Sequence, residues 1–244
     1  MSERHSSEFS WPKRVKAAGD AVRFIDAAGF CMLFPVKNVP LPSLYYAAAR
    51  RLPISWDKTT QMIWDWKDDL PRRRRAFYAK YFKARGTFIS LKFLPQFLAM
   101  RESAAGPGAA ADFYAAGRIT QDARVIWEAL ACEGPLATVE LRHACSMESA
   151  AGNARFKRAM LELQCLLIVT HFGAAQETEA WASNRFELVS RAFPKQFKHA
   201  CGITPKAARA VLARKYRSLY PDAPVMQIAR LFGWPKTEAQ AALG

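Results

Sequence analysis

The sequence predicts a mainly helical α+β protein with small β ribbons, organised as tandem winged helix-turn-helix modules. Apolar residues recur at helical spacing along most of the 244 residues. Short β-like runs interrupt the helices at 30–36, 87–91 and 186–189. In the middle of the chain a helix, a short helix, a long helix and a two-stranded ribbon follow one another, which is the element order of a winged helix.

The first elements begin after a polar segment. Residues 1–15 are predicted to form a flexible N-terminus, and 16–102 a basic winged-helix-like module. Apolar spacing predicts a first helix over 16–28, which Gly29 ends. The apolar run at 30–36 then predicts a strand or a buried extended segment.

Two capped helices and an arginine run come next. Ser43 is predicted to cap a helix that reaches about Arg51. Asp57 is predicted to cap a second helix, which Leu70-Pro71 ends. The Arg72–Arg75 run is predicted to open a further helix. Four aromatic residues belong to that predicted helix: Phe77, Tyr78, Tyr81 and Phe82. A strand at 87–91 and a helix at 93–101 complete the module.

A small-residue segment separates this module from the next. Residues 103–117 are predicted to be a linker, and 118–192 a central winged helix. Its helices are predicted at 120–132, at 138–145 and from an N-cap at Asn153, and its ribbon at 166–171 and 186–189. A generic small helical domain is the alternative interpretation.

The last part, 193–244, is predicted to be an abbreviated helix-turn-helix module. Apolar spacing predicts helices at 205–219 and 225–232, and a third short helix to Leu243. The chain ends before any wing, so the expected module is incomplete.

Charge is concentrated at the two ends of the chain. The formal net charge is +15, with a hydrophobic content of 51%, which excludes wholesale disorder. Residues 1–102 have a balance of +10, residues 103–190 of −3 and residues 191–244 of +8. Such a basic balance favours a polyanion partner, with nucleic acid as the first candidate. An inert basic surface is the alternative.

Motifs for other functions are missing from the sequence. The five cysteines form no C-x-x-C, and the four histidines show no ligand spacing, so no metal is expected. The chain also lacks a phosphate loop, a dinucleotide fingerprint and a hydrolase elbow, and no cofactor is expected. Since no apolar run is long enough for a membrane span and no signal peptide is present, a cytoplasmic location without membrane contact is expected.

Three sequence segments resemble a known family. They are GFCMLFPVKNVPLPSLYYAAARRL (29–52), WDWKDDLPRRRRAFYAKY (64–81) and ARAVLARKYRSLYPDAPVMQIARLFGWP (208–235). The order resembles the AlkZ/YcaQ group of winged-helix proteins from about residue 17 to the end. That group includes bacterial DNA glycosylases that excise alkylated or crosslinked bases and contain three tandem winged-helix modules. The resemblance implies DNA repair as the setting, and a DNA glycosylase if the protein is an enzyme.

One departure from the family pattern affects the expected chemistry. The glycosylases carry Gln-x-Gln or Gln-x-Asp after the first helix, and here Met32 and Phe34 stand at those two positions. Neither side chain can orient water or act as a base. No catalytic residue is therefore carried over. Gln61, Asp65, Asp68 and Asp69 could form a rearranged site, although a solvated carboxylate cluster that balances Arg72–Arg75 is the favoured interpretation.

Candidate phosphate and base contacts come from three regions, because basic side chains neutralise phosphates and release counterions. The candidates are Arg72, Arg73, Arg74, Arg75, Lys80, Lys83 and Arg85 in the first module, Asn153, Arg155, Lys157 and Arg158 in the central helix, and Arg209, Arg214, Lys215 and Arg217 near the end. Trp64 or Trp66 could stack on bases. For the first set the alternative is a helix whose aromatic face is core and whose arginines are solvated, and for the central set it is a protein-interaction surface. A transcription regulator or a protein-interaction module is the alternative for the chain.

Overall fold

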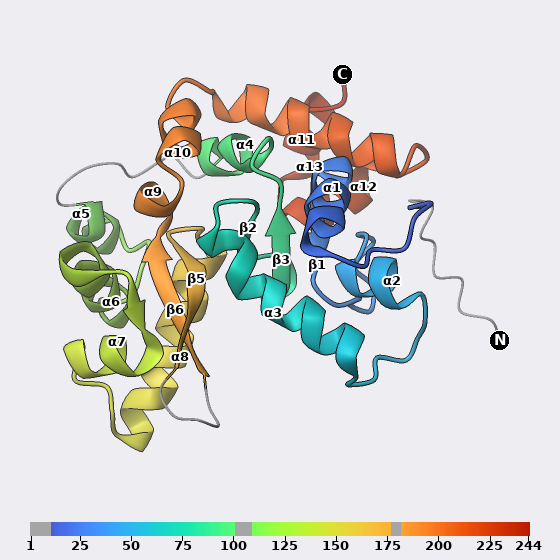
Figure 1. The fold of residues 1–244 in the computed structure, drawn as a ribbon. Coiled ribbons are helices and arrows are strands. Elements are labelled where there is room, and N and C mark those ends of the chain that lie inside the picture. Colours follow the sequence, from blue (N-terminus) through green and yellow to red (C-terminus); the bar gives the residue numbers. More distant parts are fainter. Residues whose placement is uncertain (1–10, 101–108, 177–181) are drawn as a thin grey trace.

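A computed structural model describes residues 11–100, 109–176 and 182–244 (Figure 1). The predicted flexible N-terminus lies mostly outside these residues, as do residues 103–108 of the predicted linker and residues 177–181 between the two predicted ribbon strands. Helices dominate, and two three-stranded antiparallel sheets accompany them, which confirms the α+β class.

The first unit contains α1 (Ala18–Ala28), β1 (Phe30–Met32), α2 (Leu44–Ala49), α3 (Lys58–Arg72), β2 (Phe77–Lys80) and β3 (Gly86–Ile89). A short 3-10 turn, η1 (Phe82–Ala84), joins β2 to β3. The strand order is β1-β3-β2, and Cys31 and Tyr78 both oppose Phe88. α4 (Leu94–Ala99) follows.

Local sequence signals explain most boundaries in this unit. Gly29 ends α1 with a φ of 79°, a conformation that favours glycine. The Ser43 hydroxyl accepts a hydrogen bond from Tyr46 N, and the Asp57 carboxylate accepts one from Thr60 N, so both predicted caps are confirmed.

The second unit repeats the order of the first. It contains α5 (Ala109–Ala115), α6 (Gln121–Glu133), β4 (Leu136–Ala137), α7 (Thr138–Ala144), α8 (Ala150–Cys165), β5 (Val169–Gln176) and β6 (Ala182–Leu188). Its strand order, β4-β6-β5, matches β1-β3-β2 of the first unit position for position. Helix, strand, helix, helix and hairpin therefore occur twice in the same arrangement.

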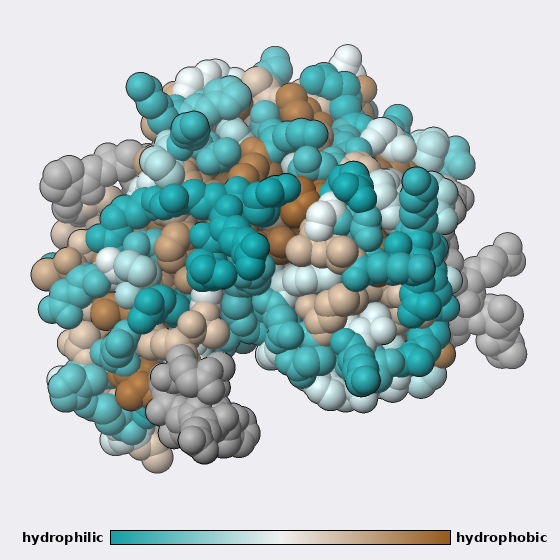
Figure 2. Space-filling model, viewed as in Figure 1, coloured by the Kyte–Doolittle hydropathy of each residue, from teal (hydrophilic) through white to brown (hydrophobic). Residues whose placement is uncertain are grey.

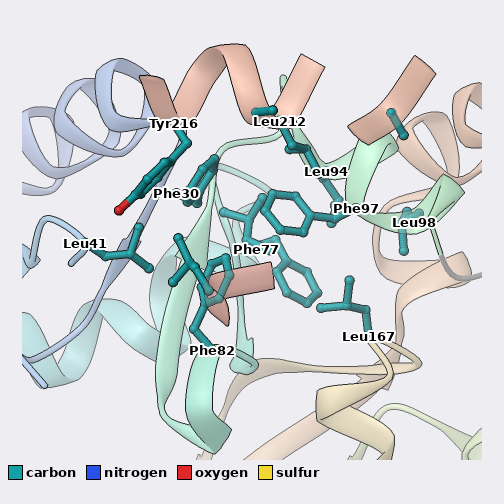
Figure 3. Close-up of a cluster of buried hydrophobic side chains, with 14 of the residues drawn as sticks. Phe30, Leu41, Phe77, Phe82, Leu94, Phe97, Leu98, Leu167, Leu212 and Tyr216 are labelled. Atoms are coloured by element: carbon teal, nitrogen blue, oxygen red, sulfur yellow. The ribbon is translucent and has the colours of Figure 1, made fainter. Parts of the chain in front are cut away.

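The remaining helices cover the sheet of the first unit. They are α9 (Val189–Ala192), α10 (Pro194–Ala200), α11 (Pro205–Leu219), α12 (Val225–Phe232) and α13 (Lys236–Ala241). Phe30, Phe77 and Phe82 from the sheet side pack with Leu212 and Tyr216 of α11 in one buried cluster (Figure 3). Burial of so many aromatic side chains is the main stabilising contribution here.

Both faces of the first sheet are buried. Met32, Phe77 and Ile89 face the cluster shared with α11, whereas Cys31 and Tyr78 face a second cluster with α1 and α3. The C-terminal helices thus share a core with the first sheet. The predicted division into modules stays a prediction.

The prediction that Arg72–Arg75 begins a helix is wrong. α3 continues through Pro71 to Arg72, and Arg74 ends it with a left-handed φ of 51°. Arg75 N donates to Leu70 O and Arg74 N donates to Pro71 O, which is the Schellman pattern of a helix end. Phe77 and Tyr78 then lie in β2. Because both faces of β2 are buried, its apolar residues do not alternate with polar ones and imitate a helix.

Smaller corrections concern the second half. Ser149 caps α8, with its hydroxyl accepting from Gly152 N, so Asn153 lies inside the helix and is not its cap. The predicted linker contains α5 in its described part. α9 and α10 were not predicted as helices.

Candidate nucleic-acid interface

The β2–β3 hairpin carries three exposed cations: Lys80 at the end of β2, and Lys83 and Arg85 in the turn. Lys83 and Ala84 have φ values of 51° and 55°, which make the turn tight. Thr87 holds its base, because the Thr87 hydroxyl donates to Arg85 O at 2.9 Å and accepts from Phe82 N at 3.2 Å. Within the described chain none of the three cations has an acidic partner within ion-pair distance.

α8 of the second unit packs directly against this hairpin. Lys80 N donates to Gln164 Oε1 at 3.1 Å, and the Cys165 thiol donates to Lys80 O at 3.2 Å. Arg158 lies seven residues before Cys165, hence on the same helix stripe and about 10 Å along the axis. Lys157 and Arg158 are exposed and make no ion pair with the residues described. The fold thus brings cations from two units to one surface.

Arg155 lies on the same helix, but its side chain is paired with an acidic residue of the protein. Its guanidinium donates to Asp122 Oδ2 at 2.9 Å, and the hydrogen bond to Arg155 lowers the pKa of the Asp122 carboxyl. Asn153 is half-buried. Of the four candidate residues on α8, Lys157 and Arg158 are therefore free to contact a phosphate, whereas Asn153 and Arg155 are less accessible.

Three arginines at the end of α3 have protein partners. Asp69 Oδ1 accepts from Arg72 at 2.7 Å and from Arg73 at 2.8 Å. Partial burial opposes ionisation of Asp69, but these hydrogen bonds outweigh it and lower the pKa of the carboxyl. Arg74 Nε donates to Ala192 O at 2.8 Å. Figure 2 shows strongly hydrophilic side chains over the region where α3 ends.

Arg75 differs from its neighbours, since it is exposed and has no side-chain partner among the described residues. The α11 cations divide in a similar way. Arg209 Nη1 lies 3.2 Å from Glu238 Oε2, and Lys215 Nζ donates to Ala27 O at 2.6 Å. Burial lowers the pKa of Lys215. Arg214 and Arg217 are exposed, without a partner in the described chain.

The acidic residues of α3 do not form one cluster. Gln61 Nε2 donates to Asp65 Oδ1 at 2.7 Å on the surface, and Asp69 pairs with Arg72 and Arg73. Asp68 instead points into a buried contact with the second unit. The interpretation as a single solvated carboxylate cluster is therefore wrong for Asp68.

The buried contact contains Lys67, Asp68, His171 and Asn184. Lys67 Nζ donates to Asp68 and, at 2.9 Å, to Asn184 Oδ1. Burial lowers the pKa of Lys67, although the Asp68 carboxylate opposes that shift. The cluster joins α3 to the β5–β6 hairpin and so fixes how the two units meet.

Met32 and Phe34, the two positions that the family resemblance assigns to the catalytic motif, both lie in apolar surroundings. Met32 is fully buried in the cluster that contains Phe30 and Phe82. Phe34 is partly buried and packs on Tyr45 and Trp64, with ring centroids 5.7 and 6.4 Å away. Trp66, a candidate for base stacking, is 7% exposed, whereas Trp64 is 39% exposed.

One exposed aromatic residue has no counterpart among the predicted sites. Trp56, in the segment between α2 and α3, is 63% exposed, and its ring packs edge-on against Trp64. Its position beside Trp64 depends on the path of the loop, which residue spacing alone does not reveal.

No cluster of His, Cys, Asp and Glu suited to a metal occurs in the described residues. Across the same residues, none of the helices combines the length and apolarity of a membrane span.

The chain is a mainly helical α+β protein that contains the same helix and hairpin unit twice. Sequence comparison identifies the family to which it belongs. The family model described as AlkZ related matches residues 15–233, so the chain belongs to the AlkZ-related family, as the sequence resemblance predicted. The structure of Streptomyces sahachiroi DNA glycosylase AlkZ is similar, with 14% identity and a TM-score of 0.48. The similarity covers 94% of this chain and 62% of that one, which is less than two thirds of its length. No curated protein matches the sequence.

Proposed function

We propose that this protein binds double-stranded DNA non-covalently, mainly through phosphates, in DNA repair or damage recognition, without the usual glycosylase chemistry. The observation that carries the proposal is the packing of the β2–β3 hairpin against α8. It gathers Lys80, Lys83 and Arg85 with Lys157 and Arg158. Membership of the AlkZ-related family supports DNA as the polyanion.

Both repeated units are winged-helix modules in this proposal. α3 and α8 take the place of the third helix, and the β2–β3 and β5–β6 hairpins take the place of wings. A third helix normally enters the major groove. Asp65 and Asp69 on α3 oppose close approach of phosphates there, so α8 and the β2–β3 hairpin are the better groove and backbone contacts.

The test is a salt titration of binding to a random duplex. The logarithm of affinity should fall linearly with the logarithm of salt concentration, with a slope of about −0.9 per phosphate neutralised. The double variant Lys83→Gln with Arg85→Gln should reduce the slope by roughly 2 units. Lys13→Gln with Lys16→Gln is the matched control, because both lysines are exposed and precede α1, outside the hairpin and α8.

The salt titration and a comparison of specific with random duplexes separate the alternatives. A flat salt response contradicts DNA binding and favours a protein-interaction module. A preference of about 10³ or more for one sequence over random duplex favours a transcription regulator.

A further inference from the structure

Two tryptophans, Trp64 on α3 and Trp56 just before α3, form an exposed aromatic pair, called the aromatic step below. Trp56 is 63% exposed and Trp64 39% exposed. Their ring centroids are 5.8 Å apart with an interplanar angle of 65°. A large aromatic side chain as exposed as Trp56 loses apolar burial, so this arrangement indicates a surface that contacts a ligand.

Trp64, the less exposed ring of the aromatic step, is held in place by its neighbours. Phe34 stacks on Trp64 with centroids 6.4 Å apart and planes 26° apart, and Lys67 Nζ lies 4.5 Å from the Trp64 centroid. Lys67 is itself held by Asp68 and Asn184. Trp64 is therefore anchored by its neighbours, and Trp56, which packs against it, presents the more accessible ring.

A polar edge lies next to the exposed ring. A shallow hollow of about 490 Å³ is lined by Trp56, Gln61 and Asp65, among others. Gln61 Nε2 donates to Asp65 Oδ1 at 2.7 Å. Gln61 Oε1 and Asp65 Oδ2 accept no hydrogen bond from the described residues, so they can accept from an exocyclic amino group of a nucleobase.

The aromatic step and the cationic hairpin are neighbours. Leu33 N donates to Gly86 O at 2.8 Å, so Phe34 follows a residue that is hydrogen-bonded directly beside Arg85. Phe34 then touches Trp64. A strand whose phosphates contact Lys83 and Arg85 therefore passes close to Trp64 and Trp56.

We propose that an unpaired nucleobase of the bound DNA stacks on Trp56, with its polar edge on Gln61 and Asp65. This inference rests on the proposed function and specifies its substrate as DNA that contains an unpaired base. Bases inside an intact duplex present no free face, whereas an unpaired base does. Stacking on an aromatic side chain contributes a factor of about 5 to 150 in affinity.

The test compares two duplexes of equal length, one fully paired and one with a single-adenosine bulge, in fluorescence anisotropy at fixed salt. Wild type should bind the bulged duplex at least about fivefold more tightly. Trp56→Ala should remove that preference and leave affinity for the paired duplex unchanged, and Trp56→Phe should keep part of it. Tyr114→Ala, at a residue 41% exposed on α5, is the control and should keep the full preference.

The other possible binding results show which of the two proposals is overturned. Equal binding of both duplexes by wild type overturns the stacking site but leaves the proposed function in place if the paired duplex shows the salt slope. A Trp56→Ala variant that keeps the bulge preference, or that loses affinity for both duplexes equally, also overturns the stacking site. Absence of binding to either duplex overturns both proposals.

Discussion

His171 Nδ1 donates to Asp68 Oδ1 across 3.0 Å, which links β5 of the second unit to α3 of the first. The His171 ring also packs edge-on against Tyr78 and Phe186, with centroids 4.9 and 4.8 Å away. The Asp68 carboxylate therefore accepts hydrogen bonds from two buried donors, Lys67 and His171. These bonds hold the two repeated units in one orientation. Since α8 and the β2–β3 hairpin belong to different units, their shared cationic surface depends on this contact.

Asp68→Asn should destabilise the protein strongly. The change leaves the Lys67 ammonium, whose side chain is 3% exposed, without its carboxylate, and an unpaired buried charge costs about 3 kcal/mol. Urea unfolding measures the loss. Asp65→Asn, an exposed change on the same helix, should cost under about 0.5 kcal/mol. Equal stability of the two variants would contradict the role of the buried cluster.

Stability should fall in mildly acidic solution because of His171. Burial lowers the pKa of His171 from its usual 6.5, so the unfolded chain binds this proton more readily than the folded protein. Stability is then full above pH 6.5 and decreases as pH drops toward the lower folded-state pKa, by up to about 1.4 kcal/mol per pH unit. Urea unfolding between pH 7.5 and about 5 should show this slope.

The matched variants identify the group responsible. His171→Gln should flatten the slope, because no imidazole remains to be protonated. His143→Gln changes an exposed histidine and should keep it. A slope that survives His171→Gln would assign the pH dependence to another residue.

Helix ends were predictable where a short sequence signal decides them. α11 and α12 have the bounds that apolar spacing predicts, because Thr204 caps one and Gly233, with φ of 72°, ends the other. β2 was not predictable, since its neighbours on both faces come from distant segments. The same limit applies to the candidate site. Arg155 and its partner Asp122 are 33 residues apart in the sequence, and Lys215 and its partner Ala27 are 188 apart. Residue spacing therefore could not show which cations bind other parts of the protein and which are free to bind a ligand.

Lys215 and Arg217 should respond differently to substitution. Lys215 donates to Ala27 O at the end of α1, and its stem packs against Gly29, so Lys215→Met should cost about 1.5 kcal/mol of stability and leave the salt slope of DNA binding unchanged. Arg217→Gln should leave stability unchanged and reduce the slope by about 1 unit. Chemical denaturation and a salt titration of both variants measure the two effects. A reduced slope for Lys215→Met would place Lys215 in the interface.

Arg74 and Arg75 provide the same contrast at the end of α3. Arg74 Nε donates to Ala192 O, so Arg74→Gln should lower stability by about 1 kcal/mol, with little effect on the salt slope. Arg75 is exposed, and Arg75→Gln should reduce the slope by about 1 unit at unchanged stability. The result that would contradict this assignment is a larger slope change for Arg74→Gln.

Wild type should release no bases from alkylated DNA, because the positions expected to activate water hold Met32 in the core and Phe34 against Trp64. Restoring the polar pair with Met32→Gln and Phe34→Asp should not create activity. The Met32→Gln change buries an amide among aromatic side chains at a cost of about 3 kcal/mol, and the double variant should unfold earlier in urea. Alkaline cleavage after incubation with alkylated DNA reports abasic sites. Abasic sites above a protein-free control, lost in Asp65→Asn, would show instead that a rearranged site on α3 catalyses glycosidic cleavage.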